Sequence, residues 1–140
     1  MNLLDRGVLL LIKPRVIHSI PGRMRLHVPM LKRVKPGSKQ WVPLLAEMLG
    51  TPDGIYEVTP CITTGNILLK YNLEKLSEPD IVNYLKALTT IFYSHREKLE
   101  GVNGKDPEVI KQRLIPWLQQ ALSQCLHLDD QLRIPADVFE

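Results

Sequence analysis

The stretch VIHSIPGRMRLHVPM, residues 16–30, decides the fold because it contains the clearest strand pattern of the chain. From Arg23 onward polar and apolar residues alternate, and successive side chains of a strand point to opposite faces. The alternation therefore predicts a strand with one buried face and one solvated face. Pro21-Gly22 predicts a turn before this strand, and Pro29 limits it at the far end. The predicted buried side carries Met24, Leu26, Val28 and Met30, and the predicted solvated side carries Arg23, Arg25 and His27.

The elements that follow are read from apolar spacing and from turn residues. They are a helix over residues 39–49, strands over 55–59 and 66–71 with a connection over 60–66, a helix over 77–100, and a helix that begins at Asp106-Pro107. The short connection contains Thr64-Gly65-Asn66, so the two strands should pair antiparallel. Pro116 falls inside the last helix and is expected to kink or break it, because proline removes a backbone donor.

The order strand, helix, strand, strand, helix predicts an α+β, ferredoxin-like antiparallel sheet with helices on one face, plus an extra C-terminal helix and tail. The fourth strand of that plan is not evident after the second helix. It comes either from the tail, residues 132–139, or from an N-terminal strand such as residues 16–19. The predicted organisation is an N-terminal segment (1–14), a ferredoxin-like domain (15–100), and a C-terminal helical extension with a tail (101–140).

Charge is distributed unevenly along the 140 residues, whose formal net charge is +3. No acidic residue occurs between Asp5 and Glu47, which predicts a positive face or end. The two cysteines, Cys61 and Cys125, form no CxxC pair and suit a reducing compartment. The apolar run over 8–12 is too short for a membrane span, so we expect a cytoplasmic protein, with peripheral membrane association left open. The basic residues of this span are Lys13, Arg15, Arg23, Arg25, Lys32, Arg33, Lys35 and Lys39.

The motifs HSIPGRMRL, residues 18–26, and TGNILLKY, residues 64–71, resemble the heavy-metal-associated domain superfamily. They are similar in particular to its divergent second group, marked by an HSIPGRxRLxV opening and a VxPxTGxxLVxY-type hairpin, and the likeness covers roughly residues 15–88. It implies a ferredoxin-like fold and a role near metal handling, as a single small protein or beside a metal-transporting ATPase. The chain lacks the GMxCxxC motif of the metallochaperone domains and has the basic loop 31–39 in its place. The dithiolate transfer of copper or zinc is therefore not implied.

Three residues are candidate ligands for a transition metal or haem: His18, His27 and Cys61. Imidazole binds both kinds of centre, and cationic neighbours would lower the pKa of the Cys61 thiol. The ordinary alternatives are a His18 hydrogen bond to the turn, an exposed strand histidine at His27 and an incidental loop thiol. The residues expected to bind an anion or a partner are Arg23, Arg25, Lys32, Arg33 and Lys35, since guanidinium groups pair with carboxylates and haem propionates.

No catalytic motif is present, neither GxSxG, HExxH nor a glycine-rich phosphate loop, so an enzyme is not expected. The sequence favours a small binding or adaptor module associated with metal handling, with a protein partner or self-association. One alternative is nucleic-acid or anionic-partner binding by the same face, although the first strand has no aromatic residue for base stacking. The other is a structural or targeting adaptor that acts through residues 106–140.

Overall fold

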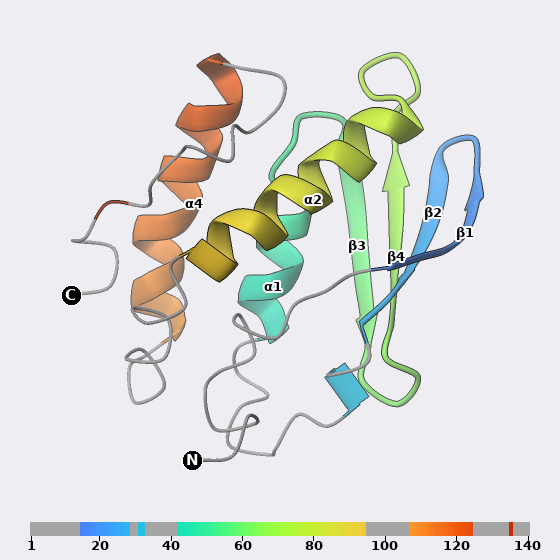
Figure 1. Ribbon diagram of the computed structural model, residues 1–140, viewed down its shortest axis with the longest axis horizontal. Helices are drawn as coiled ribbons and strands as arrows, with labels where there is room; N and C mark the ends of the chain where they lie inside the picture. The colour runs from blue at the N-terminus through green and yellow to red at the C-terminus, as the bar shows by residue number, and fades with distance from the viewer. Residues whose placement is uncertain (1–14, 29–30, 33–41, 95–106, 125–134, 136–140) are drawn as a thin grey trace.

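The computed structural model describes residues 15–28, 31–32, 42–94, 107–124 and 135 (Figure 1). This part of the chain is an α+β protein with a four-stranded antiparallel sheet. None of its helices is both long and apolar enough to cross a membrane. Its elements, in chain order, are β1 (Arg15–Ile20), β2 (Arg23–His27), α1 (Val42–Leu49), β3 (Ile55–Cys61), β4 (Asn66–Tyr71), α2 (Glu78–Ser94) and α4 (Pro107–Gln124).

The sheet has the strand order β1-β2-β4-β3, and every neighbouring pair is antiparallel. The edge strand beside β2 is β1, which precedes β2 in sequence. It is a separate short strand and not an extension of β2. Of the two sources predicted for the fourth strand, the N-terminal one takes this position, and most of residues 132–139 lie outside the described residues. The order of the four described strands and their antiparallel directions are compatible with a ferredoxin-like arrangement.

Two hairpin turns set the register of the sheet, and each needs a glycine with positive φ. Gly22, with φ of 81°, joins β1 to β2, and its carbonyl accepts a 3.0 Å hydrogen bond from the amide of Tyr71. Gly65, with φ of 75°, closes the β3–β4 turn, and its carbonyl accepts a 2.8 Å bond from the amide of Val28. Each turn is therefore tied to a strand outside its own hairpin.

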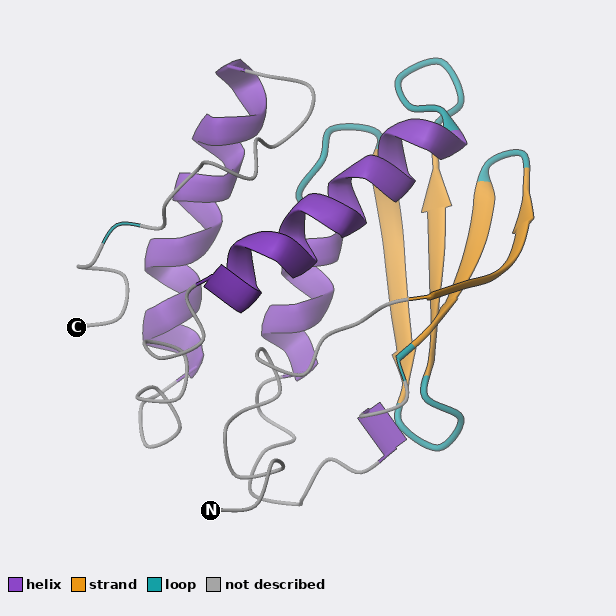
Figure 2. Cartoon of the chain, in the orientation of Figure 1, coloured by secondary structure: helices purple, strands orange, loops and turns teal. Residues whose placement is uncertain are grey.

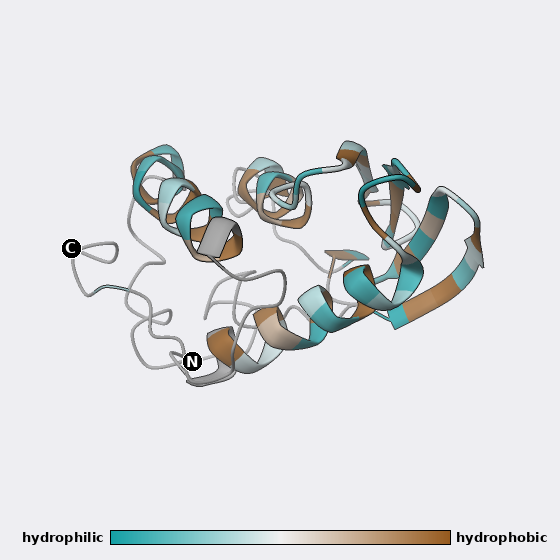
Figure 3. Cartoon of the chain, turned by 90° about the horizontal axis from the view of Figure 1, so that it is seen from above, coloured by the Kyte–Doolittle hydropathy of each residue, from teal (hydrophilic) through white to brown (hydrophobic). Residues whose placement is uncertain are grey.

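Helices α1 and α2 lie on one side of the sheet, as predicted, and α4 lies beyond them (Figure 2). Seen from above, the sheet occupies one end of the molecule and α4 the other (Figure 3). The side of the sheet that faces away from these helices is called the open face below. The alternation of β2 is confirmed, because Met24, Leu26 and Val28 are buried while Arg23 and Arg25 are exposed.

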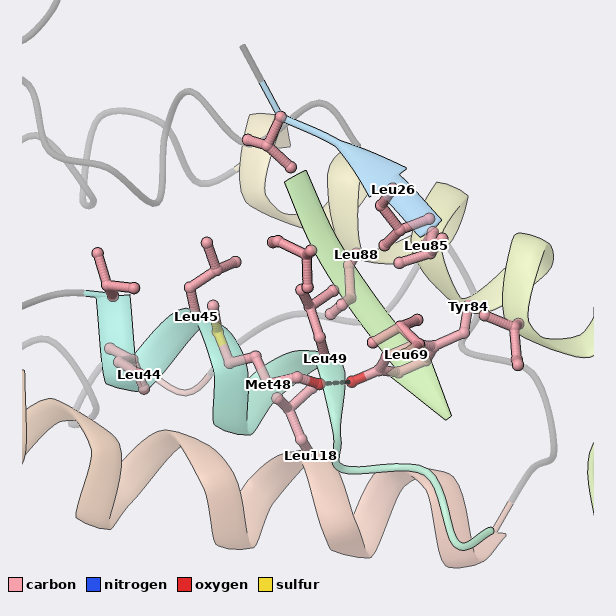
Figure 4. Packing of buried hydrophobic residues seen from close by; sticks show 14 of the residues in the cluster. Leu26, Leu44, Leu45, Met48, Leu49, Leu69, Tyr84, Leu85, Leu88 and Leu118 are labelled. Atoms are coloured by element: carbon pink, nitrogen blue, oxygen red, sulfur yellow. Dashed lines mark hydrogen bonds between the residues drawn. The ribbon is translucent and has the colours of Figure 1, made fainter. Parts of the chain in front are cut away.

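One apolar core joins the sheet to α1, α2 and α4 (Figure 4). Leu49 of α1, Leu69 of β4 and Leu118 of α4 are each 1% exposed or less. The buried hydroxyl of Tyr84 in α2 donates a 2.6 Å hydrogen bond to the carbonyl of Met48 in α1. This bond links the two helices that cover the sheet.

Two local predictions are wrong. Strand β3 continues to Cys61, beyond the predicted end at Thr59, so Pro60 lies within a strand. Because β3 is an edge strand, the missing amide of Pro60 need not leave a ladder bond unmade. The predicted break at Pro116 is also wrong, because α4 is continuous through this residue. Pro116 and Gln112, whose carbonyl loses its usual donor, are both exposed, so water can satisfy that carbonyl.

Candidate binding face

The strand register arranges the side chains of the open face in three cross-strand rows. Each row takes one residue from each strand, in the order β1, β2, β4, β3. The rows are Ile20, Arg23, Lys70 and Glu57; then His18, Arg25, Leu68 and Thr59; then Arg15, His27, Asn66 and Cys61.

A shallow hollow of about 420 Å³, called the basic hollow below, lies on the β1–β2 half of this face. A register shift between Val16 and His18 makes a bulge at Ile17. The extra residue brings Ile17 to the same side as His18, so an aliphatic side chain stands beside the imidazole. The residues that line the basic hollow are Ile17, His18, Ile20, Arg23 and Arg25.

Positive charge on the open face is unbalanced at β1 and β2 and balanced at β3 and β4. Lys70 forms a 3.2 Å ion pair with Glu57. Arg15, Arg23 and Arg25, by contrast, form no ion pair with any residue that the structure describes. Their exposed guanidinium groups are therefore available to an external anion.

His27 lies at the other end of β2 from the β1–β2 turn, and neighbouring groups hold its ring. Its Nδ1 is 2.8 Å from Oδ1 of Asn66. Since that oxygen only accepts, Nδ1 carries the proton and the lone pair of the neutral ring is on Nε2. The ring also approaches Gly65, because a Cβ placed there would lie 3.2 Å from Cε1 of His27 and 2.9 Å from Cγ of Lys32. His27 and Lys32 are thus gathered at the β3–β4 turn.

Cys61 is an exposed free thiol at the end of β3. Hydrogen bonding lowers the pKa of this thiol, with the Thr64 side chain as the largest cause and the backbone of Thr64 and Thr63 adding to it. The predicted cause, cationic neighbours in the 31–39 loop, is wrong for Lys32, which does not contribute to the shift. Arg33 and Lys35 lie outside the described residues. Among the described residues, the groups that lower the pKa of the Cys61 thiol all belong to the β3–β4 turn.

The three candidate ligands are not brought together. His27 and Cys61 stand two strands apart, about 9.6 Å at the usual strand spacing, with Asn66 between them. His18 belongs to a different row and to the basic hollow. Within the described part of the chain, no group of three His, Cys, Asp or Glu residues could hold a metal ion. Of the three candidate ligands, only His18 lines the basic hollow with Arg23 and Arg25, whereas His27 lies opposite Arg15 at the other end of the sheet.

The sequence reasoning missed two parts of this surface. Ile17 and Ile20 line the basic hollow with 44% and 45% of their surface exposed, although isoleucine in a strand usually indicates a buried side. Asn66 fixes the His27 ring from β4, 39 residues away in sequence. The exposure of Ile20 could have been predicted from its position beside the Pro21-Gly22 turn. Nothing in the sequence marks the bulge that exposes Ile17.

The chain matches no protein-family model, no curated protein and no solved structure.

Proposed function

We propose that this protein is a small non-enzymatic binding module that acts through the basic hollow and takes part in metal handling. The observation that carries the proposal is the pair Arg23 and Arg25, exposed on the open face beside His18 and unpaired with any described acid. Such a site suits an anionic partner, or a metal complex that carries carboxylates, because guanidinium groups pair with carboxylates in a bidentate manner.

The fold that we propose is ferredoxin-like, with β1 in the position of the last strand. The strand order, the antiparallel directions and the two helices on one side support this assignment. The edge strand then precedes the first strand of the usual plan in sequence. This arrangement exposes His18 of β1 opposite Arg25 of β2.

The ligand that this site favours is haem or a similar metal complex, rather than a bare ion. A bare ion usually needs three or four protein ligands, and the candidate ligands are spread over separate rows. A metal complex brings its own ligands and needs one imidazole, for which His18 is placed. Arg23 and Arg25 would then pair with its carboxylates.

The test is titration of the purified protein with haemin and with divalent metal ions, followed by absorption spectroscopy. We expect a saturable change of the haemin spectrum that His18→Ala abolishes. His27→Ala is the matched control, since it removes an imidazole of the same face outside the basic hollow. Absence of saturable binding to haemin and to every metal ion would overturn the metal-handling part of the proposal. Full binding by His18→Ala would overturn the assignment to His18.

The alternative of RNA binding is disfavoured by the residues of the central strands. Across β2 and β4 the open face carries Arg23, Arg25, His27, Asn66, Leu68 and Lys70. None of the six is a phenylalanine, tyrosine or tryptophan on which bases could stack, as RNA-binding sheets of this plan require. Tyr56 is exposed but belongs to the edge strand β3.

The setting that we propose is the cytoplasm, beside a partner protein such as a metal-transporting ATPase. The free, exposed thiol of Cys61 suits a reducing compartment. Self-association through the basic hollow is disfavoured, because two copies facing each other there would oppose arginine to arginine.

A further inference from the structure

We propose that the open face docks on an anionic lipid bilayer, with lipid phosphates at the basic hollow and the exposed aliphatic residues of β1 in the headgroup region. The inference rests on the proposed function, since it names a partner for the same arginines. It starts from where exposed apolar side chains gather in the described part of the chain.

Exposed large apolar side chains are concentrated at the sheet. Of the five among the described residues, Ile17, Ile20 and Tyr56 lie on strands, and Leu73 lies two residues after the end of β4. Their exposed fractions are 44%, 45%, 70% and 56%, and only Val109 lies on a helix. The β1–β2 turn, the start of β3 and the end of β4 meet at one end of the sheet (Figure 1). Ile20, Tyr56 and Leu73 therefore gather at that end.

The same surface carries the unpaired cations. Arg23 lies opposite Ile20 in the same cross-strand row, and Arg25 follows Arg23 by two residues on the open face of β2. Glu57 is the only acidic residue in the three rows, and Lys70 pairs with it. Aliphatic and tyrosine side chains beside guanidinium groups are the combination that binds bilayer interfaces, since apolar parts enter the headgroup region while cations meet lipid phosphates.

The form of the face suits a bilayer. It is an open sheet surface with one shallow hollow of about 420 Å³ at β1 and β2. A bilayer needs no complementary shape, only cations and apolar tips directed the same way. Each lysine or arginine near an anionic surface raises affinity about fivefold.

Cosedimentation with vesicles tests the inference. We expect the full chain to bind vesicles of equimolar phosphatidylserine and phosphatidylcholine but not pure phosphatidylcholine, and binding should fall as salt rises. Arg23→Ala and Arg25→Ala should each weaken binding about fivefold, and the double variant about 25-fold. Lys86→Ala is the matched control, because it removes one positive charge from the exposed surface of α2, on the helix side of the sheet. It should leave binding nearly unchanged.

A second pair of variants separates docking from simple charge attraction. Ile17→Ser and Ile20→Ser keep the charge, so they should weaken binding without changing its salt dependence. Circular dichroism melting of every variant shows whether it is folded. Inorganic phosphate at matched ionic strength should displace the protein no better than chloride, and strong displacement would mean a site for free phosphate, which overturns bilayer docking.

The inference and the proposed function fail differently. If anionic vesicles do not bind at low salt, or bind the double arginine variant as well as the unchanged protein, bilayer docking is wrong. Binding of poly-glutamate in place of vesicles would identify an acidic protein segment as the partner, which also overturns bilayer docking but leaves the proposed function in place. A negative titration with haemin and metal ions overturns the metal-handling role. The vesicle experiment still tests bilayer docking independently.

Discussion

At the scale of single residues, the open face combines the alternating side chains of β2 with a side-chain bond between β2 and β4. The exposure of Arg23 and Arg25 follows from the period of a strand, because the residues between them are apolar. The His27–Asn66 bond joins residues of two strands and depends on the exact register, which the sequence does not specify. The same holds for Cys61, where the pKa shift arises from the turn that the strand enters.

Thr64 should control the reactivity of Cys61. Its hydroxyl oxygen accepts a 3.2 Å bond from the amide of Asn66, and the Thr64 side chain is the largest cause of the lowered pKa of the Cys61 thiol. Replacement by valine removes that hydroxyl, so we expect the pH profile of Cys61 alkylation to move to higher pH. Thr64→Ser should keep the profile in place. Peptide-level mass spectrometry reads Cys61 separately from Cys125, and an unmoved profile in the valine variant would contradict the assignment.

The Tyr84 hydroxyl should contribute to stability through its bond to the Met48 carbonyl. A buried bond of this kind contributes about 1 kcal/mol, so Tyr84→Phe should lower the free energy of unfolding by about that amount. Tyr56→Phe, at a 70% exposed position, is the control and should change it by less than about 0.5 kcal/mol. Urea unfolding measures both variants, and equal losses would show that the buried bond has no special role.

The Tyr84 bond also implies a dependence on alkaline pH. Burial raises the pKa of Tyr84. The stability that comes from the neutral phenol is therefore fully present below the ordinary tyrosine pKa of about 10 and is lost as the pH rises above it. The phenylalanine variant should show less of this alkaline loss in the same measurement.

At the scale of elements, helix existence and type could be predicted from apolar spacing, whereas strand ends and the effect of Pro116 could not. The spacing of Ile110, Leu114 and Leu118 marks one face of α4, and these residues are all buried. Helix α4 continues past Pro116 at a position where both Pro116 and Gln112 are exposed, and this exposure is a property of the folded surface. The bulges at Ile17 and Tyr56 likewise depend on pairing between strands rather than on local sequence.

Helix α4 should prove part of the core rather than a detachable extension. Leu114 is 1% exposed, so Leu114→Ala should lower the free energy of unfolding by about 2–5 kcal/mol. Val109→Ala is the control on the same helix, at a 42% exposed position, and should cost less than about 0.5 kcal/mol. Chemical denaturation in one cooperative transition would accompany this result. A loss below about 0.5 kcal/mol for Leu114→Ala would show that α4 packs only weakly.

At the scale of the whole molecule, charge and packing divide the protein into two sides. The helices bury their apolar faces against one side of the sheet and against one another, and Lys111 of α4 reaches Glu47 of α1 at 3.5 Å. Arg23 and Arg25 of β2, which form no ion pair with a described residue, lie on the other side. The run of sequence without acids predicted a positive face, but its location on the β1–β2 half required the strand order.

The origin of the edge strand has a consequence for how the chain folds during synthesis. β1 and β2 form a hairpin with a two-residue turn, which closes faster than a pairing that joins distant parts of a chain. All four strands that the structure describes precede α2 and α4 in sequence, so they emerge from the ribosome before these helices do. The nascent polypeptide can therefore begin to pair these strands before α2 and α4 have left the ribosome.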